Sequence, residues 1–231
     1  MSSTIEFFIA RNAGAEPPLG ARLDTPSGAQ RHSVVLLAHG AGVDIDHPWM
    51  ASMSRALVGR GFAVLRFRYP YMELAARLAR RRPPDPTSVL EQAHHDALDE
   101  LRRRFPVRRW LLAGKSLGAR ISTHIAAKGA HAHGLVLLGY PLHPPGKPER
   151  ERSEHFATLA QPALFVHGSR DEFGTLDELR DALRRYSGRA ELESIDGGDH
   201  SFERGARHPL PATLERVAEL VEHWDARTFP D

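Results

Sequence analysis

Residues 110–120, WLLAGKSLGAR, carry the pattern that decides the fold of this chain. Trp110–Ala113 is a short apolar run, which is typical of a buried strand. Gly114–Gly118 follows with the pattern G-x-S-x-G, and the residues after it have apolar side chains at helical spacing. A strand, this pentapeptide and a helix in that order are the context of a nucleophile elbow, a sharp turn that exposes a serine hydroxyl above a sheet. The sequence therefore predicts Ser116 as a nucleophile.

Two glycines flank Ser116, and the expected turn explains why. A strand that runs straight into a helix strains the central residue and brings backbone segments close together. Gly114 and Gly118 have no Cβ atom, so they permit this close approach. The same turn is expected to leave the backbone N–H of Leu117 free in the first turn of the helix.

The same residues also match part of a phosphate-binding loop. Gly114, Lys115 and Ser116 are the GKS of a Walker A motif, which requires a further glycine five residues before Gly114. Arg109 occupies that position, and residues 109–113, RWLLA, are typical of a strand and not of a flexible loop. The phosphate-loop interpretation is therefore the weaker of the two.

Two later segments supply an acid and a base for the predicted nucleophile. A serine of this kind needs a base, the base needs an orienting acid, and the expected order along the chain is Ser, then Asp or Glu, then His. Asp171 comes just after the apolar run 162–168, and His200 follows the predicted strand 190–196 in a glycine-rich segment. The sequence thus predicts a triad of Ser116, Asp171 and His200.

Neighbouring side chains are weaker candidates for these roles. Glu172 follows Asp171 directly, but a side chain one residue further on points elsewhere, and Asp177 is expected inside the next helix. His39 and His167 are expected to support loop backbone through hydrogen bonds. The histidines show no HExxH spacing, so a zinc site is not expected.

An oxyanion hole is predicted from the segment HGAG, residues 39–42. Acyl transfer needs backbone N–H groups directed at the oxygen that becomes negatively charged. The N–H of Leu117 is one expected donor, and the other is expected from the loop after an early strand. Ala41 is the preferred second donor, and Gly42 is the next choice. The alternative is that these glycines only form a tight turn.

The composition is that of a soluble globular protein. The chain has 231 residues, 41% of them hydrophobic and 26% charged, and a net charge of +2, which requires no nucleic-acid partner. It has no cysteine, which excludes disulfides, thiol catalysis and cysteine metal ligands. The N-terminal residues lack the features of a signal peptide, and no window approaches the about 20 apolar residues of a membrane helix. We therefore expect a cytoplasmic monomer or small homo-oligomer without a membrane partner.

Apolar runs and helical patterns alternate along the chain. The expected strands are 4–10, 21–25, 33–42, 62–70, 110–113, 134–141, 162–168 and 190–196, with a turn at 12–20. The expected helices are 47–61, 89–106, 119–129, 175–188 and 211–229. This alternation predicts one α/β domain over residues 1–231, with a mostly parallel sheet and helices on both faces. The strand at 21–25 is expected to be antiparallel and at the edge.

Several basic residues near the predicted site have two interpretations each. Residues 76–86, ARLARRRPPDP, contain prolines that prevent a continuous helix and arginines that are expected on a solvated surface. The longer segment 69–87 leaves the end of a strand, from which it can lean over the site. Arg68 is expected either to bind an acidic group of the substrate or to hold a loop. Lys115 is expected either to add positive potential for the substrate or to bond a loop.

The motifs together resemble the α/β-hydrolase superfamily over nearly the whole chain. LAHGAG, GKSLG, HGSRDEFG and GGDHSF are similar to small hydrolases of the dienelactone-hydrolase type, with Ser116 in place of the cysteine of that enzyme. FRYPYMELAARLARRRPPDP with GKSLGAR more closely resembles the group of testis-expressed protein 30 and NSL complex subunit 3. The resemblance implies an α/β-hydrolase fold with an eight-stranded, mostly parallel sheet. It leaves the function open, because some members of that group are subunits of complexes.

The sequence thus predicts a serine hydrolase of the carboxylesterase type, acting on a small acyl substrate. Ser116 attacks the carbonyl, His200 transfers the proton and Asp171 orients the imidazole, with no metal or organic cofactor. Residues 141–161 separate two predicted strands and are too few for a large cap domain. The alternatives are a non-catalytic scaffold or binding module on the same fold, and an acyltransferase.

Overall fold

Eight strands form one sheet in the order β1-β2-β4-β3-β5-β6-β7-β8 in the computed structural model, which describes residues 2–11, 16–205 and 209–230. The strands are β1 (Ser3–Ile9), β2 (Leu19–Thr25), β3 (Ser33–Ala38), β4 (Ala63–Phe67), β5 (Arg109–Lys115), β6 (Gly134–Leu138), β7 (Ala163–Gly168) and β8 (Ala190–Ile195). Only β1 with β2 and β2 with β4 pair antiparallel. The mostly parallel eight-stranded sheet of the prediction is confirmed.

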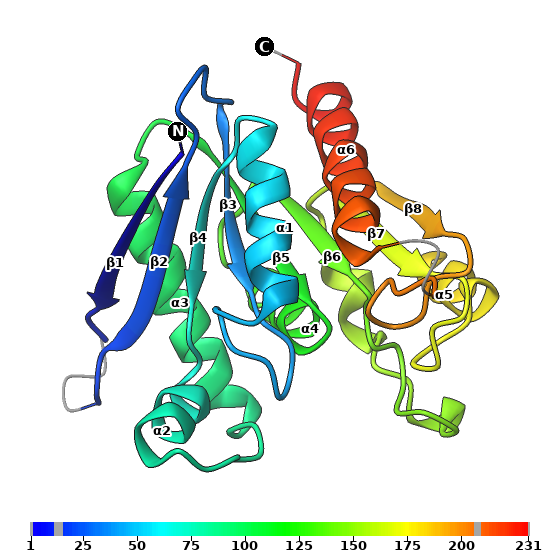
Figure 1. Ribbon diagram of the computed structural model, residues 1–231. Helices are drawn as coiled ribbons and strands as arrows, with labels where there is room; N and C mark the ends of the chain where they lie inside the picture. The colour runs from blue at the N-terminus through cyan, green and yellow to red at the C-terminus, as the bar shows by residue number, and fades with distance from the viewer. Residues whose placement is uncertain (1, 12–15, 206–208, 231) are drawn as a thin grey trace.

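Helices cover both faces of the sheet (Figure 1). In that view α1 (Pro48–Gly59) and α6 (Leu210–Thr228) lie in front, and α3 (Thr87–Arg104), α4 (Leu117–Ala127) and α5 (Leu176–Leu183) lie behind. Helix α2 (Pro70–Leu78) lies below the lower edge of the sheet. The apolar run of β3 shows why both layers are needed. Leu36 packs into the core behind the sheet, whereas Leu37 packs into the core in front of it. A strand buried on both faces has no polar face, and this accounts for its continuous apolar sequence.

The N-terminal hairpin differs from the prediction in one respect. β1 forms the edge of the sheet, and β2 lies between β1 and β4. The prediction that the strand at 21–25 lies at the edge is therefore wrong. β2 is largely buried because it pairs with a strand on each side, and Asp24 on it accepts hydrogen bonds from Arg66 of β4 and Ser54 of α1. Residues 12–15 of the predicted turn at 12–20 lie outside the described residues.

Helix α2 is the element that the sequence analysis missed. Pro70 occupies the first turn of this helix, where a missing N–H group costs no hydrogen bond. The helix ends at Ala79, whose φ of 48° is left-handed. The prolines of the segment 76–86 lie beyond this end, so they limit the helix without preventing it. Residues 79–86 have no regular structure.

Between β6 and β7 the chain forms only two short 3-10 helices, η1 (Pro148–Arg150) and η2 (Glu154–Thr158). The expected absence of a large cap in residues 141–161 is therefore confirmed. Among the residues that the structure describes, no helix has an apolar stretch long enough to span a bilayer.

Candidate active site

The turn between β5 and α4 has the geometry of a strained elbow. Ser116 has φ 53° and ψ −111°, a conformation that costs a residue with a side chain free energy. A Cβ atom at Gly114 would lie 2.2 Å from the carbonyl carbon of Gly118. A Cβ atom at Gly118 would lie 2.4 Å from the carbonyl oxygen of Ala38 on β3. Only glycine fits at both positions, so the G-x-S-x-G spacing follows from the packing of α4 against the sheet.

The structure brings the three predicted triad residues together at the C-terminal edge of the sheet. His200 Nε2 lies 2.8 Å from Ser116 Oγ. On the other side of the ring, His200 Nδ1 lies 2.8 Å and 3.0 Å from the two carboxylate oxygens of Asp171. An ionised carboxylate only accepts hydrogen bonds, so Nδ1 carries the proton and Nε2 is free to accept one from the serine hydroxyl.

Asp171 is held in its ionised form. Its side chain is fully buried, and burial acts to raise the pKa of the carboxyl group. The hydrogen bond and charge of His200, the charge of His167 and the backbone N–H of Phe173 outweigh this effect and lower the pKa below its usual value. The carboxylate therefore stays negative at neutral pH and fixes the orientation and tautomer of the imidazole.

Phe173 is a site residue that the sequence analysis missed. Its N–H donates a hydrogen bond to Asp171 Oδ1 at 2.9 Å. Its ring packs against the ring of His200, with centroids 4.1 Å apart and planes inclined by 31°. Phe173 thus holds both the acid and the base. Its place two residues after Asp171 was the available signal, but that spacing does not reveal which ring it contacts.

His39 supports the loop that begins the segment 39–42. It is fully buried, and its Nδ1 donates to the carbonyl of Gly40 at 2.8 Å. Its Nε2 accepts from the N–H of Tyr69 at 3.1 Å, so the ring ties this loop to the end of β4. Burial above all lowers the pKa of His39 to about 4, which keeps the ring neutral. This is the loop-supporting role that the sequence predicts for His39.

The two preferred oxyanion donors lie on either side of the nucleophile. A Cβ atom at Gly40 would lie 3.5 Å from the Cβ of Ser116, so the loop passes directly beside the elbow. The N–H groups of Ala41 and Leu117 donate to no other oxygen in the described part of the chain. The hydroxyl of Tyr71 on α2 donates to the carbonyl of Gly40 at 3.4 Å, which helps to hold this loop in place. The free N–H groups of Ala41 and Leu117 are consistent with the two preferred donor positions.

Arg68 lies among carboxylates. Its Nε donates to Asp44 at 2.7 Å, and one terminal nitrogen donates to Asp46 at 2.9 Å. The carboxylate of Glu73 on α2 lies 4.0 Å from the other terminal nitrogen. The guanidinium therefore ties the loop after β3 to β4 and α2. This contact set matches the loop-holding alternative for Arg68 better than the substrate-binding one.

Lys115 lies beneath the base instead of facing the substrate side. Its ammonium donates to the carbonyl oxygen of His200. It also lies 5.8 Å from the ring centroids of Trp49 and Phe202. Burial lowers the pKa of Lys115 to about 8, against the opposing effect of Asp171 and a second aspartate. Lys115 is thus a cation that supports the loop carrying His200.

The site opens directly to the surface, and the nucleophile and base are both partly exposed. No group of three or more His, Asp or Glu side chains suited to hold a metal ion occurs in the described ranges 2–11, 16–205 and 209–230.

Comparisons with known proteins agree with this architecture. A dienelactone hydrolase from Anabaena variabilis has 22% identity and a TM-score of 0.76, with 98% of each chain covered. An α/β serine hydrolase homologue from Coxiella burnetii has 20% identity and a TM-score of 0.73, covering 95% of this chain and 96% of that one. A lidless α/β serine hydrolase from Xanthomonas campestris has 18% identity and a TM-score of 0.72, covering 99% and 96%. At these identities the likeness establishes the fold alone.

The match to a family extends over most of the chain. Residues 31–224 match the family described as alpha/beta hydrolase domain. The matched range contains every predicted member of the triad and both preferred oxyanion donors. The finer grouping with testis-expressed protein 30 and NSL complex subunit 3 stays a prediction. The chain belongs to the alpha/beta hydrolase domain family.

Proposed function

We propose that this protein is a serine hydrolase that cleaves a small carboxylic ester or a related acyl compound. The observation that carries the proposal is the hydrogen-bonded series from Asp171 through His200 to Ser116, with both links at 2.8 Å at their shortest. The serine hydroxyl that ends this series stands on a strained elbow. Strain at such a position persists only where the surrounding structure imposes it, and it is concentrated at functional sites.

The chemistry follows from these positions. The hydroxyl of Ser116 attacks the ester carbonyl while His200 Nε2 takes its proton. The N–H groups of Leu117 and Ala41 stabilise the negative oxygen of the tetrahedral intermediate. His200 then gives its proton to the leaving alcohol, which leaves the acyl group on Ser116. Water, deprotonated by the same imidazole, releases the acid. These steps use only groups of the chain and water.

The open site favours a small substrate. No cap domain is inserted between β6 and β7, because this connection forms only two short 3-10 helices. A lidless site encloses little of the substrate, so most of the binding contacts are expected close to the carbonyl. Short-chain esters are therefore the preferred first substrates for a screen.

An active-site probe tests the proposal. A fluorophosphonate reacts with an activated serine and leaves a stable adduct whose position mass spectrometry identifies. We expect labelling of Ser116 in the wild type and none in Ser116→Ala or His200→Ala. Ser187→Ala is the matched control, because Ser187 is exposed on the loop before β8. This variant should be labelled at Ser116 as the wild type is.

Each outcome separates the proposal from its alternatives. Absent labelling, or labelling that persists in Ser116→Ala, would leave a scaffold or binding module as the better reading. Labelling together with transfer of the acyl group to an added alcohol, in preference to water, would identify an acyltransferase. Labelling with release of the free acid supports the hydrolase.

A further inference from the structure

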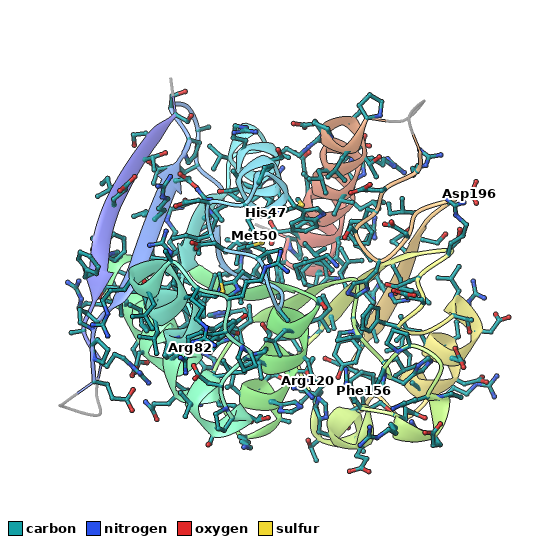
Figure 2. All side chains as sticks on the ribbon, turned by 60° about the horizontal axis from the view of Figure 1, so that its bottom comes forward. His47, Met50, Arg82, Arg120, Phe156 and Asp196 are labelled. Atoms are coloured by element: carbon teal, nitrogen blue, oxygen red, sulfur yellow. The ribbon has the colours of Figure 1, made fainter. Side chains whose placement is uncertain are left out.

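A groove of about 600 Å³ runs along α4, between α3 and η2. It begins at Arg120, which lies one helical turn after Ser116 and whose N–H bonds to the carbonyl of Ser116 at 3.1 Å. Figure 2 shows Arg120 on the side of α4 that faces the segment carrying Phe156. Four residues of helix advance about 6 Å, so the backbone of Arg120 lies about one turn along α4 from that of Ser116.

Two arginines in this groove have no acidic partner. The guanidinium of Arg120 makes no hydrogen bond or ion pair with any residue that the structure describes. Within the described residues, the one hydrogen bond of the Arg152 guanidinium goes to the carbonyl of Pro141, at 3.5 Å. Burial first, and then the charge of Arg120, lower the pKa of Arg152, so the two like charges lie close enough to repel each other. The repulsion between the two guanidinium groups costs free energy, and an anion bound between them would remove this cost.

Two histidines that line the same groove carry no charge at neutral pH. The rings of His124 and His155 lie 4.7 Å apart. Burial lowers the pKa of His155 to about 4, and His124 and Arg120 act in the same direction. Burial, followed by Arg120, also lowers the pKa of His124. Both rings are therefore neutral at pH 7. One nitrogen of each ring is bonded within the protein, His124 Nδ1 to Glu91 and His155 Nε2 to Thr123.

The carboxylates that line the groove do not neutralise the arginines. Glu91 is bound by Lys128 at 2.6 Å and by His124 at 3.2 Å. Glu151 pairs with Arg185, which follows the end of α5 and lies outside the groove. Glu154 is exposed at the rim and forms no ion pair with a described residue. The positive charge of Arg120 and Arg152 thus remains available to a ligand.

We propose that Arg120 and Arg152 together bind an anionic group, a carboxylate or a phosphate, at the far end of the ester substrate. The inference rests on the proposed function, and it narrows the substrate class to esters that carry a negative charge a few bonds from the scissile carbonyl. Guanidinium groups suit this role because their paired N–H donors match the two oxygens of a carboxylate or phosphate. An anion between the two arginines also relieves their mutual repulsion.

Matched esters test the proposal through their rates. The p-nitrophenyl monoester of glutaric acid carries a terminal carboxylate, p-nitrophenyl pentanoate has the same acyl length without charge, and the ester of 4-phosphonobutanoic acid carries a phosphonate. We expect kcat/KM to be about tenfold higher for at least one anionic ester than for the neutral one. A hydrogen bond to a charged group stabilises a complex by enough to give this ratio. Arg120→Gln and Arg152→Gln should each remove most of this preference, and Arg120→Lys should keep part of it.

The control removes one charge at a distance. Arg184→Gln deletes an exposed arginine at the C-terminal end of α5 and should leave the preference as it is in the wild type. A preference that survives in both Arg120→Gln and Arg152→Gln, or a wild-type enzyme without any preference, would overturn the proposal. The carboxylate and phosphonate arms show which of the two anions the site takes.

A binding measurement separates this proposal from the proposed function. In Ser116→Ala, which cannot form an acyl-enzyme, glutarate or inorganic phosphate should raise the melting temperature and should do so less when Arg120→Gln is added. Anion binding without probe labelling of the wild type would contradict the proposed hydrolase activity and would still support the anion site. Labelling without anion binding in Ser116→Ala would overturn the anion site alone.

Discussion

The two sides of the elbow balance their charges in opposite ways. On the side of β3 and β4, Arg66 is bonded to Asp24 and Arg68 lies among three carboxylates. On the side of α3, α4 and η2, Arg120 and Arg152 have no carboxylate in contact among the described residues. A cation that the protein neutralises holds a loop or a strand in place. A cation that the protein leaves without a counterion is free to bind an anionic ligand.

This difference places structural and ligand-binding charge on separate elements. The paired side carries the loop whose Ala41 amide is a proposed oxyanion donor, so rigidity there serves the geometry of the reaction. The unpaired side begins one helical turn from Ser116, so a flexible contact there can follow the shape of a substrate. The predictions below test the two sides against each other.

The largest effect is expected where both sides meet. Ser116→Ala should lower kcat by about 10⁶ for neutral and anionic esters alike, because it removes the nucleophile that either kind of substrate requires. Initial rates with both esters measure the effect. Adding His200→Ala to Ser116→Ala should lower the rate little further, since the two side chains act as a unit. A residual rate within about a hundredfold of the wild type would mean that another group carries the reaction.

The next effect concerns the paired side. Asp24→Ala leaves the guanidinium of Arg66, which is 4% exposed, without its carboxylate. We expect the free energy of unfolding to fall by about 3–5 kcal/mol, as when one partner of a buried ion pair is removed. Arg120→Gln, on the unpaired side, should change it by less than about 0.5 kcal/mol. Urea unfolding of both variants measures the contrast, and equal losses would contradict the distinction between the two sides.

The parts of the site that depend on local backbone geometry were predictable from the sequence. Gly114 is required by a contact with Gly118 in the same turn, and Gly118 by the close approach of the turn to Ala38 on β3. Both requirements belong to the elbow motif itself, so the elbow could be recognised from five residues. Asp171 and His200 were recognised because each follows a strand in the order that the fold imposes. Their positions at strand ends bring them to one edge of the sheet, whatever the residues between them are.

The remaining features depend on contacts between distant segments. The packing of Phe173 on His200 and the free charge of Arg120 follow from how loops and helices meet in space, and no spacing in the sequence encodes them. The same holds for β1 as the edge strand, because β2 becomes an inner strand only by pairing with β4, which lies about 40 residues away. Helix α2 was missed because nearby prolines obscured a short helical segment that ends before them.

Lys115 is a third kind of cation, which is buried and which, among the described residues, donates its hydrogen bond to the carbonyl of His200. Its pKa is about 8 in the folded protein against 10.5 ordinarily, so the unfolded chain holds the proton more tightly. Stability should therefore rise with pH between about 8 and 10.5, by up to about 3 kcal/mol, and the penalty is fully present below pH 8. Lys115→Met should lack this rise.

Urea unfolding at about pH 7.5 and about pH 10 checks the difference between the wild type and Lys115→Met. Comparing the two proteins removes the contribution of tyrosines and other groups that titrate in the same range. The same pH dependence in both proteins would show that Lys115 is not the buried cation that the structure describes.

The smallest effect is expected from the arginine that the protein already neutralises. Arg68→Gln should change the ratio of kcat/KM for the glutarate monoester and the pentanoate ester by less than about twofold, because Asp44, Asp46 and Glu73 occupy its guanidinium. Arg120→Gln, which removes the same charge on the other side of Ser116, is the matched comparison. If the ratio fell in Arg68→Gln and not in Arg120→Gln, the ligand-binding charge would lie on the paired side. Contact with a protein carboxylate would then be no guide to which arginine binds a substrate.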